Sequence, residues 1–122
     1  MPAYQSQSGG IPGPWLDVII ISRDGADRRV LGILDTGADQ TQVPESVAAA
    51  LRLRPIGHRT FTNANGSSST SRTYVADVEF DGRRYRMIEV AGSPLRIALI
   101  GRDILNSLVA EFDGPANRYD LR

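Results

Sequence analysis

Short apolar segments alternate with glycine, proline and polar turns along most of the chain, and this pattern is typical of a mainly β domain. Residues 15–21 are rich in β-branched and aromatic side chains, which predicts a strand. Residues 30–34 and 95–100 are largely apolar without alternation, which favours strands that are buried on both faces. We therefore expect many short strands and at most two short helices.

Local signals mark the helices and the C-terminal part of the chain. Pro44 is suited to start a short helix, and residues 102–108 place apolar side chains on one side of a second helix. Residues 109–113 and 118–121 flank a Gly-Pro-Ala-Asn turn, and they predict a closing hairpin.

Another hairpin is predicted over residues 75–90, with Asp81-Gly82 as its two-residue turn. This turn sets charged residues opposite residues of opposite charge, and apolar residues opposite apolar ones, as cross-strand neighbours require. The predicted pairs are Glu79 with Arg84, Asp77 with Arg86, Val78 with Tyr85 and Ala76 with Met87. The three arginines of this hairpin are therefore interpreted as its solvated face rather than as a nucleic-acid patch.

Composition limits the function of the chain. A length of 122 residues suits one domain, here residues 15–122 after a flexible, polar N-terminal arm at residues 1–14. The 14 basic and 14 acidic side chains give zero formal charge, which removes the electrostatic case for nucleic-acid or membrane-surface partners. The lack of cysteine and the single histidine, His58, exclude disulfides, thiolate zinc sites, cysteine nucleophiles and paired-histidine catalysis within one chain.

Residue usage also bears on source and location. Arginine supplies every basic residue, which excludes Schiff-base lysine chemistry and is typical of a GC-rich genome, so we expect a bacterial source. No segment approaches the ~20 apolar residues of a membrane span. Residues 1–10 lack the charged and apolar regions of a signal peptide, so a cytoplasmic location is expected.

Two segments carry candidate chemistry. Asp35-Thr36-Gly37 directly follows the first apolar run, where an aspartate is costly unless hydrogen bonds or a charged partner compensate it. Gly37 allows close approach of the backbone and offers an N–H to the carboxylate. Taken alone, this tripeptide is equally well an ordinary turn. The second segment, Gly101-Arg102-Asp103, follows the second apolar run and opens the second predicted helix.

In this order and at this spacing, the two segments resemble the motifs of the retropepsin-like aspartic proteases, which include retroviral, retrotransposon and bacterial members. The resemblance extends over residues 15–121 in the order of the elements. It implies a retropepsin-like closed β-barrel of short strands with one or two short helices, active as a C2 homodimer. It also implies an aspartic endopeptidase that acts on peptide or protein substrates and uses no cofactor or metal.

The resemblance assigns roles residue by residue. Asp35 matches the catalytic aspartate, and Thr36 matches a residue whose hydroxyl hydrogen-bonds across the dimer axis. Gly37 matches a residue whose carbonyl accepts a hydrogen bond from the substrate backbone. Asp39 matches a residue that contacts the substrate main chain and pairs with the arginine of the second motif, here Arg102. The alternative for Asp39 and Arg102 is a purely structural ion pair.

Two positions of the motifs need separate treatment. Asp103 stands where retroviral enzymes usually carry Asn and other relatives carry Asp, so its role stays open. Ala38 has no hydroxyl to donate to the carboxylate, unlike the Ser or Thr of some relatives. We therefore expect peptidase activity to extend toward mildly acidic pH rather than to stay below about pH 4.

Peptide hydrolysis by carboxylates requires an acid and a base at one place. Two aspartates about 3 Å apart cannot both ionise, so they share a proton. The chain contains one Asp-Thr-Gly, and its other Asp-Gly pairs, at positions 24, 81 and 113, lack the middle hydroxyl residue. If the protein is a protease, Asp35 therefore has to meet Asp35 of a second copy across a two-fold axis.

The resemblance also implies a flap, a lid over the active site. The candidate is residues 60–71, with Asn65 and Gly66 at the tip as substrate-binding residues. A strict two-residue turn there would set Arg59 opposite Arg72, so we expect a longer or bulged tip. The alternative is a serine-rich loop with no clamping role.

Two functions remain open at this point. The first is an endopeptidase with an extended, mostly apolar substrate cleft. The second is a weakly active or non-catalytic module of the same fold that dimerises or binds peptides. The intact Asp35-Thr36-Gly37 favours the enzyme, whereas the atypical flap favours weak or narrowly specific activity.

Overall fold

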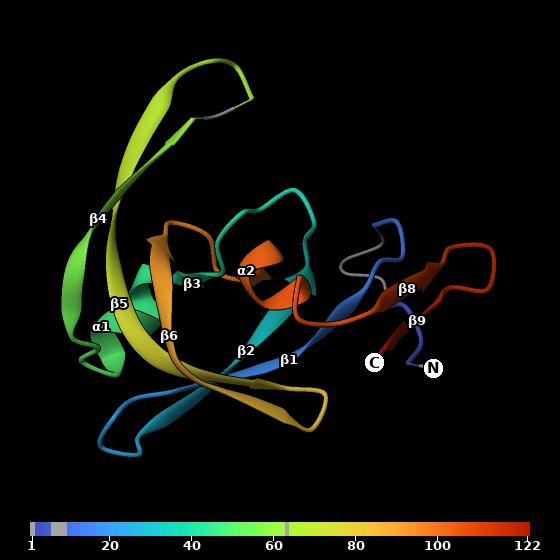
Figure 1. Cartoon of the computed structure of the whole chain (residues 1–122), viewed down its shortest axis with the longest axis horizontal. Coiled ribbons are helices and arrows are strands. Elements are labelled where there is room, and N and C mark those ends of the chain that lie inside the picture. Colours follow the sequence, from blue (N-terminus) through green and yellow to red (C-terminus); the bar gives the residue numbers. More distant parts are fainter. Residues whose placement is uncertain (1, 6–9, 63) are drawn as a thin grey trace.

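The computed structural model describes residues 2–5, 10–62 and 64–122. The elements are, in chain order, β1 (Trp15–Ile21), β2 (Asp27–Leu34), β3 (Gln42–Pro44), α1 (Glu45–Ala50), β4 (Pro55–Thr62), β5 (Ser68–Phe80), β6 (Arg83–Ser93), β7 (Ala98–Ile100), α2 (Arg102–Leu105), β8 (Ala110–Asp113) and β9 (Arg118–Leu121). This part of the chain is mainly β with two short helices, as the sequence predicts (Figure 1). Within the described residues, neither helix is long and apolar enough to cross a membrane.

Six strands close into a barrel. Their order is β1-β2-β7-β3-β6-β5, and β1 pairs with β5 to complete the ring, whereas β4 lies outside the ring on β5. The pairs β2–β7 and β3–β6 are parallel. Closure leaves no unpaired edge within the ring, and it confirms the retropepsin-like closed barrel that the resemblance implies.

The barrel interior holds the hydrophobic core. Val18 and Ile20 of β1 are fully buried, because alternate residues of a strand point to the same side. The other strands contribute further fully buried residues, namely Val43, Val78, Val90, Ala98 and Ile100. The predicted helix after Pro44 is present as α1 and covers this core with Val47 and, just beyond the helix, Leu51. Full burial of a large apolar side chain contributes roughly 1.5–3 kcal/mol.

The β5–β6 hairpin has the predicted turn. Asp81 and Gly82 both have positive φ, 51° and 71°, which a two-residue hairpin turn of this type requires. Next to the turn, the predicted pairs of Glu79 with Arg84 and of Val78 with Tyr85 are confirmed.

Further from the turn, the predicted pair of Ala76 with Met87 is wrong, and Asp77 forms its ion pair with Arg84, at 2.9 Å, rather than with Arg86. The register shifts between Ala76 and Val78, and Ala76 pairs with Ile88 instead. This bulge leaves Met87 exposed with a φ of 53°, so that Ala76 stays buried without it. The Met87 N–H donates to Asp77 Oδ1 at 2.8 Å and lowers the pKa of Asp77 below its ordinary value.

Two predicted elements are shorter than expected. Of residues 95–100, only Ala98–Ile100 forms a strand, and Leu95 is 46% exposed because the chain bends after Pro94. The second helix ends at Leu105 rather than at residue 108. There the Ser107 hydroxyl donates to the carbonyl of Ile104 at 2.7 Å, which competes with continuation of the helix.

The predicted C-terminal hairpin is confirmed as β8 and β9. Described residues of the N-terminal arm lie along β9, where Tyr119 N donates to the Pro2 carbonyl at 2.9 Å and Tyr4 N donates to the Asn117 carbonyl at 2.6 Å. Residues 2–5 and the β8–β9 hairpin therefore lie together at one end of the molecule (Figure 1). Residue 1 and residues 6–9 of the predicted arm lie outside the described residues.

Candidate active site

The two candidate segments leave the barrel side by side. Strands β2 and β7 are parallel, and their last residues, Leu34 and Ile100, are register partners. Since parallel strands end at the same edge of a sheet, the residues that follow them emerge together. The backbone N–H of Asp35 donates to the carbonyl of Ile100 at 2.9 Å, which continues the pairing by one residue.

The Asp35 carboxylate is half-buried and held by its own loop. Gly37 N donates to Asp35 Oδ1 at 2.9 Å, as expected from the sequence, and Ala38 N donates to the Asp35 carbonyl at 3.2 Å. No described residue donates a hydrogen bond to Asp35 Oδ2. One oxygen is thus fixed, while the other is open to a water or to a second acidic group, as proton transfer requires.

Gly101 lies where the backbones of the two segments pack against each other. It is buried, and a Cβ at this position would lie 2.7 Å from the carbonyl carbon of Gln40 and 2.9 Å from the carbonyl oxygen of Ala38. Next to it, Arg102 N donates to the Ala38 carbonyl at 2.8 Å. The backbones of the two segments are therefore packed as closely as they can be without a side chain between them.

Asp103, whose role the sequence left open, has a structural one. Its carboxylate accepts hydrogen bonds from Thr41 N, at 3.1 and 3.0 Å, from the Thr41 hydroxyl at 2.8 Å and from Ile104 N at 2.9 Å. The buried Thr41 hydroxyl in turn accepts from Gly101 N at 3.1 Å. This network ties the end of the Asp35 loop to the start of α2.

The predicted ion pair between Asp39 and Arg102 is wrong. Arg102 Nη1 donates to the Thr36 carbonyl at 2.7 Å and so holds the Asp35 loop through its backbone. Asp39 Oδ2 instead accepts from Arg59 Nη2 at 2.8 Å. Asp39 lies in an exposed part of the loop, within reach of the β4–β5 hairpin that curls over it (Figure 1).

Arg59 is the site residue that sequence reasoning missed. Its other nitrogen, Nη1, donates to Gln40 Oε1 at 2.7 Å, so a single guanidinium bridges two residues of the Asp35 loop. The sequence shows Arg59 only as a charged residue at the base of a predicted hairpin. Which way that hairpin bends is a tertiary property, and no local pattern reports it.

A cavity of about 630 Å³ lies between the Asp35 loop, the β4–β5 hairpin and the end of β6. Its lining residues are Gly37, Ala38, Asp39, Gln42, Thr60, Phe61, Thr62, Ser69, Ser71, Gly92, Ser93, Pro94, Leu95 and Arg102. Most of these side chains are polar, and hydroxyl groups predominate. The expected mostly apolar cleft is therefore wrong for this cavity, since its apolar part is limited to Phe61, Leu95, Pro94 and Ala38.

The hairpin tip is longer than a two-residue turn, as predicted. Thr62 pairs with Ser68, which leaves more than two residues between the paired strands, and His58 rather than Arg59 lies opposite Arg72. Asn65 and Gly66 lie between these strands and do not line the cavity. Asn63 lies outside the described residues. The structure thus brings Gly37, Ala38, Asp39 and Arg102 to one cavity. Asp35 and Thr36 adjoin it in the same loop but are not among its lining residues, and neither are Asn65 and Gly66.

Comparison with known families identifies the class of protein. A family model described as "gag-polyprotein putative aspartyl protease" matches residues 21–107, which is most of the chain. The chain belongs to this family, the retropepsin-like aspartic proteases. Among curated proteins, no significant sequence match is found.

Solved structures show the same fold at low sequence identity. A retropepsin-like aspartic protease from Rickettsia conorii is 19% identical with a TM-score of 0.58, over 90% of this chain and 82% of that one. The protease of simian foamy virus (mac) is 23% identical with a TM-score of 0.55, over 75% of this chain and 91% of that one. The EIAV protease in complex with the inhibitor HBY-793 is 20% identical with a TM-score of 0.53, over 84% and 92%.

Proposed function

We propose that the protein is an aspartic endopeptidase whose active site forms between two copies of the chain, with Asp35 as the catalytic residue of each. The observation that carries this proposal is the Asp35 carboxylate itself. It lies at the end of a barrel strand with one oxygen held by Gly37 N at 2.9 Å, and no described residue donates to the other oxygen. Membership of an aspartyl protease family supports the same reaction.

The proposed reaction uses two carboxylates that share one proton. Such a pair cannot ionise twice when its members are about 3 Å apart. The ionised member takes a proton from a water, which attacks the scissile carbonyl, and the protonated member donates to the carbonyl oxygen. The pair then returns a proton to the leaving amine, so no covalent intermediate forms. The hydrogen bond from Gly37 N to Asp35 Oδ1 fixes the orientation of this carboxylate.

A second copy of the chain has to supply the second acid. The sequence contains one Asp-Thr-Gly segment, so one chain provides one such carboxylate. A two-fold homodimer brings two identical segments together at its axis. Thr36, at the exposed part of the loop next to Asp35, is the residue that we expect to contact its equivalent across that axis.

The β4–β5 hairpin is suited to act as the lid of this site. The hairpin extends beyond the barrel (Figure 1). Thr60, Phe61 and Thr62 of β4 line the cavity. A lid that closes over bound peptide excludes bulk water from the two acids.

The open edge of β8 is the proposed dimer contact. Val109 and Arg122 exchange two backbone hydrogen bonds of 2.7 and 2.8 Å. Because hydrogen-bonded and non-hydrogen-bonded pairs alternate along an antiparallel ladder, the N–H and C=O of Ala110 and of Phe112 point away from β9. No described strand pairs with that outer edge of β8, whereas the outer edge of β9 is occupied by residues 2–4. Strand addition by a second copy satisfies these groups.

Replacement of Ala110 with Pro is expected to weaken the dimer at least about tenfold, because it removes an outward N–H donor from each copy. Sedimentation equilibrium of both proteins measures the change in Kd. Glu111→Ala is the matched control, since the Glu111 N–H points into the β8–β9 ladder and its side chain is exposed. An unchanged Kd in a folded Ala110→Pro protein contradicts this dimer contact.

The proposed function is tested by sedimentation of the purified protein with and without a transition-state inhibitor of aspartic proteases, together with cleavage of unstructured peptides. The expected result is a dimer that the inhibitor stabilises and a cleavage activity that it blocks. Binding of the inhibitor without cleavage of any peptide favours the peptide-binding module instead. A monomer that cleaves peptides contradicts the proposal.

A further inference from the structure

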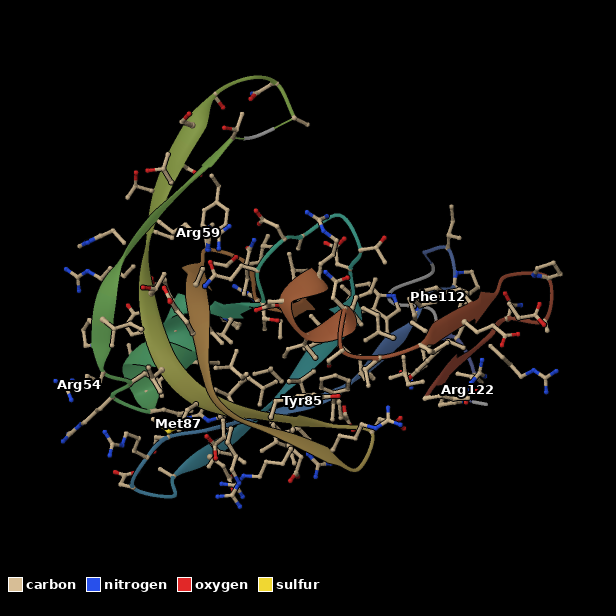
Figure 2. All side chains as sticks on the ribbon, in the orientation of Figure 1. Arg54, Arg59, Tyr85, Met87, Phe112 and Arg122 are labelled. Carbon is tan, nitrogen blue, oxygen red and sulfur yellow. The ribbon has the colours of Figure 1, made fainter. Side chains whose placement is uncertain are left out.

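Within the described part of the chain, Arg59 hydrogen-bonds the hairpin over the cavity to the Asp35 loop. Strand β4 pairs with β5 alone, and most of its residues are exposed. Among the described residues, the side-chain hydrogen bonds from β4 to the rest of the domain beyond the hairpin both come from Arg59, to Asp39 and Gln40. In Figure 2, Arg59 lies on the inner side of the arch that β4 and β5 form.

Arg59 binds to a fixed acceptor. Gln40 is only 4% exposed, and its Nε2 donates to the Glu89 carbonyl of β6 at 3.1 Å. Its Oε1 is therefore presented to Arg59 in a set direction. Because Gln40 is held by β6 of the barrel, its hydrogen bond with Arg59 fixes the distance between the hairpin and the Asp35 loop.

The shape of the guanidinium group makes this contact directional. Nη1 reaches Gln40 at 2.7 Å while Nη2 reaches Asp39 at 2.8 Å, so the two nitrogens of one planar fork bind two neighbouring residues. The guanidinium carbon also lies 5.5 Å from the ring centroid of Phe61, two residues along the same face of β4. Phe61 and Asp39 both line the cavity, so Arg59 couples its upper and lower walls.

We infer that Arg59 is a positioning residue that latches the β4–β5 hairpin to Asp39 and Gln40 and thereby sets the width of the substrate cleft. This inference rests on the proposed peptidase function. Peptide entry requires the hairpin to move away from the loop, and the latch re-forms on closure. Exposed ion pairs add little to global stability, and the Arg59 and Asp39 side chains are 42% and 51% exposed. Loss of this contact is therefore expected to change the position of the hairpin rather than the free energy of unfolding.

The test replaces Arg59 with Met, which keeps much of the aliphatic stem and removes the charge and the fork. KM for a peptide substrate is expected to rise about fivefold to tenfold, with kcat changed less than about twofold and an unchanged melting temperature. Arg59→Lys keeps the charge but lacks the two-nitrogen fork, so its KM is expected to lie between those of the wild-type and Arg59→Met proteins. Arg54→Met is the matched control, since Arg54 is an exposed arginine just before β4 with no ion pair among the described residues.

A second readout does not depend on peptidase activity. Because the chain has no cysteine, an Ala64→Cys substitution near the hairpin tip accepts a single nitroxide label. The electron paramagnetic resonance spectrum of this label is expected to show a more mobile hairpin with Arg59→Met and no change with Arg54→Met. In wild-type protein, raising NaCl from about 50 mM to about 500 mM is expected to shift the spectrum toward the Arg59→Met form.

The outcomes separate the latch from the proposed function. If the wild-type protein cleaves no peptide, the proposed function fails, and the label mobility still decides the latch. If Arg59→Met changes neither KM nor label mobility, the latch is overturned while the peptidase stands. A fall in melting temperature that accounts for the loss of binding, with an unchanged spectrum, also overturns it, because Arg59 is then a residue of general stability.

Discussion

Replacement of Asp35 with Asn is expected to lower kcat/KM for peptide cleavage by at least about a thousandfold, because the pair then loses the member that takes a proton from water. Asparagine has nearly the same shape, and its Oδ1 still accepts from Gly37 N, so the fold and the dimer are expected to persist. Peptide cleavage, thermal unfolding and sedimentation of the variant measure the three properties separately.

The matched control for this variant is Asp113→Asn. Like Asp35, Asp113 accepts a backbone N–H at its Oδ1, from Ala116 at 3.0 Å, but it is the last residue of β8, next to the turn that leads to β9. This variant is expected to keep wild-type activity. Full activity of Asp35→Asn, or an equal loss in both variants, contradicts the role of Asp35.

Replacement of Gly101 with Ala is expected to destabilise the protein by about 3 kcal/mol and to abolish activity with it. The added Cβ would lie 2.7 to 2.9 Å from backbone atoms of Ala38 and Gln40, which no side-chain rotation relieves. The two segments have to separate, and the hydrogen bond of 2.8 Å from Arg102 N to Ala38 is lost with the packing. Chemical denaturation at one fixed protein concentration measures the change.

Gly114→Ala is the control for Gly101→Ala. A Cβ at Gly114 meets no atom within 4 Å, so the expected change in the free energy of unfolding is below about 0.5 kcal/mol. Comparable stability of the Gly101→Ala and Gly114→Ala proteins contradicts the close packing of the two segments.

Local signals in the sequence predicted much of the fold. Residues 15–21 form a strand because β-branched side chains and flanking turn residues both favour it. Asp81-Gly82 forms the expected turn because this dipeptide adopts positive φ readily, and the register holds for the residues nearest to it. Asp35-Thr36-Gly37 alone is equally well an ordinary turn, and it indicates an active site only together with Gly101-Arg102-Asp103, because the two segments in this order and spacing resemble the motifs of the retropepsin-like proteases.

The errors lie where tertiary structure overrides a local pattern. Met87 was expected to pair with Ala76, but the barrel needs a buried alanine and excludes the larger side chain by a bulge. Asp39 was expected to bind Arg102, but Arg102 holds the Thr36 carbonyl and Arg59 reaches Asp39 from a hairpin 20 residues further along the chain. The curvature of that hairpin depends on the whole β5 strand, which joins β4 to the barrel.

Subunit mixing shows whether one active site needs the Asp35 residues of two chains. Wild-type protein is mixed with an equal amount of Asp35→Asn protein under conditions in which subunits exchange, and peptide cleavage is compared with that of the same wild-type protein alone. Random pairing leaves about half as many wild-type dimers as before, since mixed dimers carry one acid each. We expect the activity to fall to about one half, whereas undiminished activity in a fully exchanged mixture contradicts a shared site.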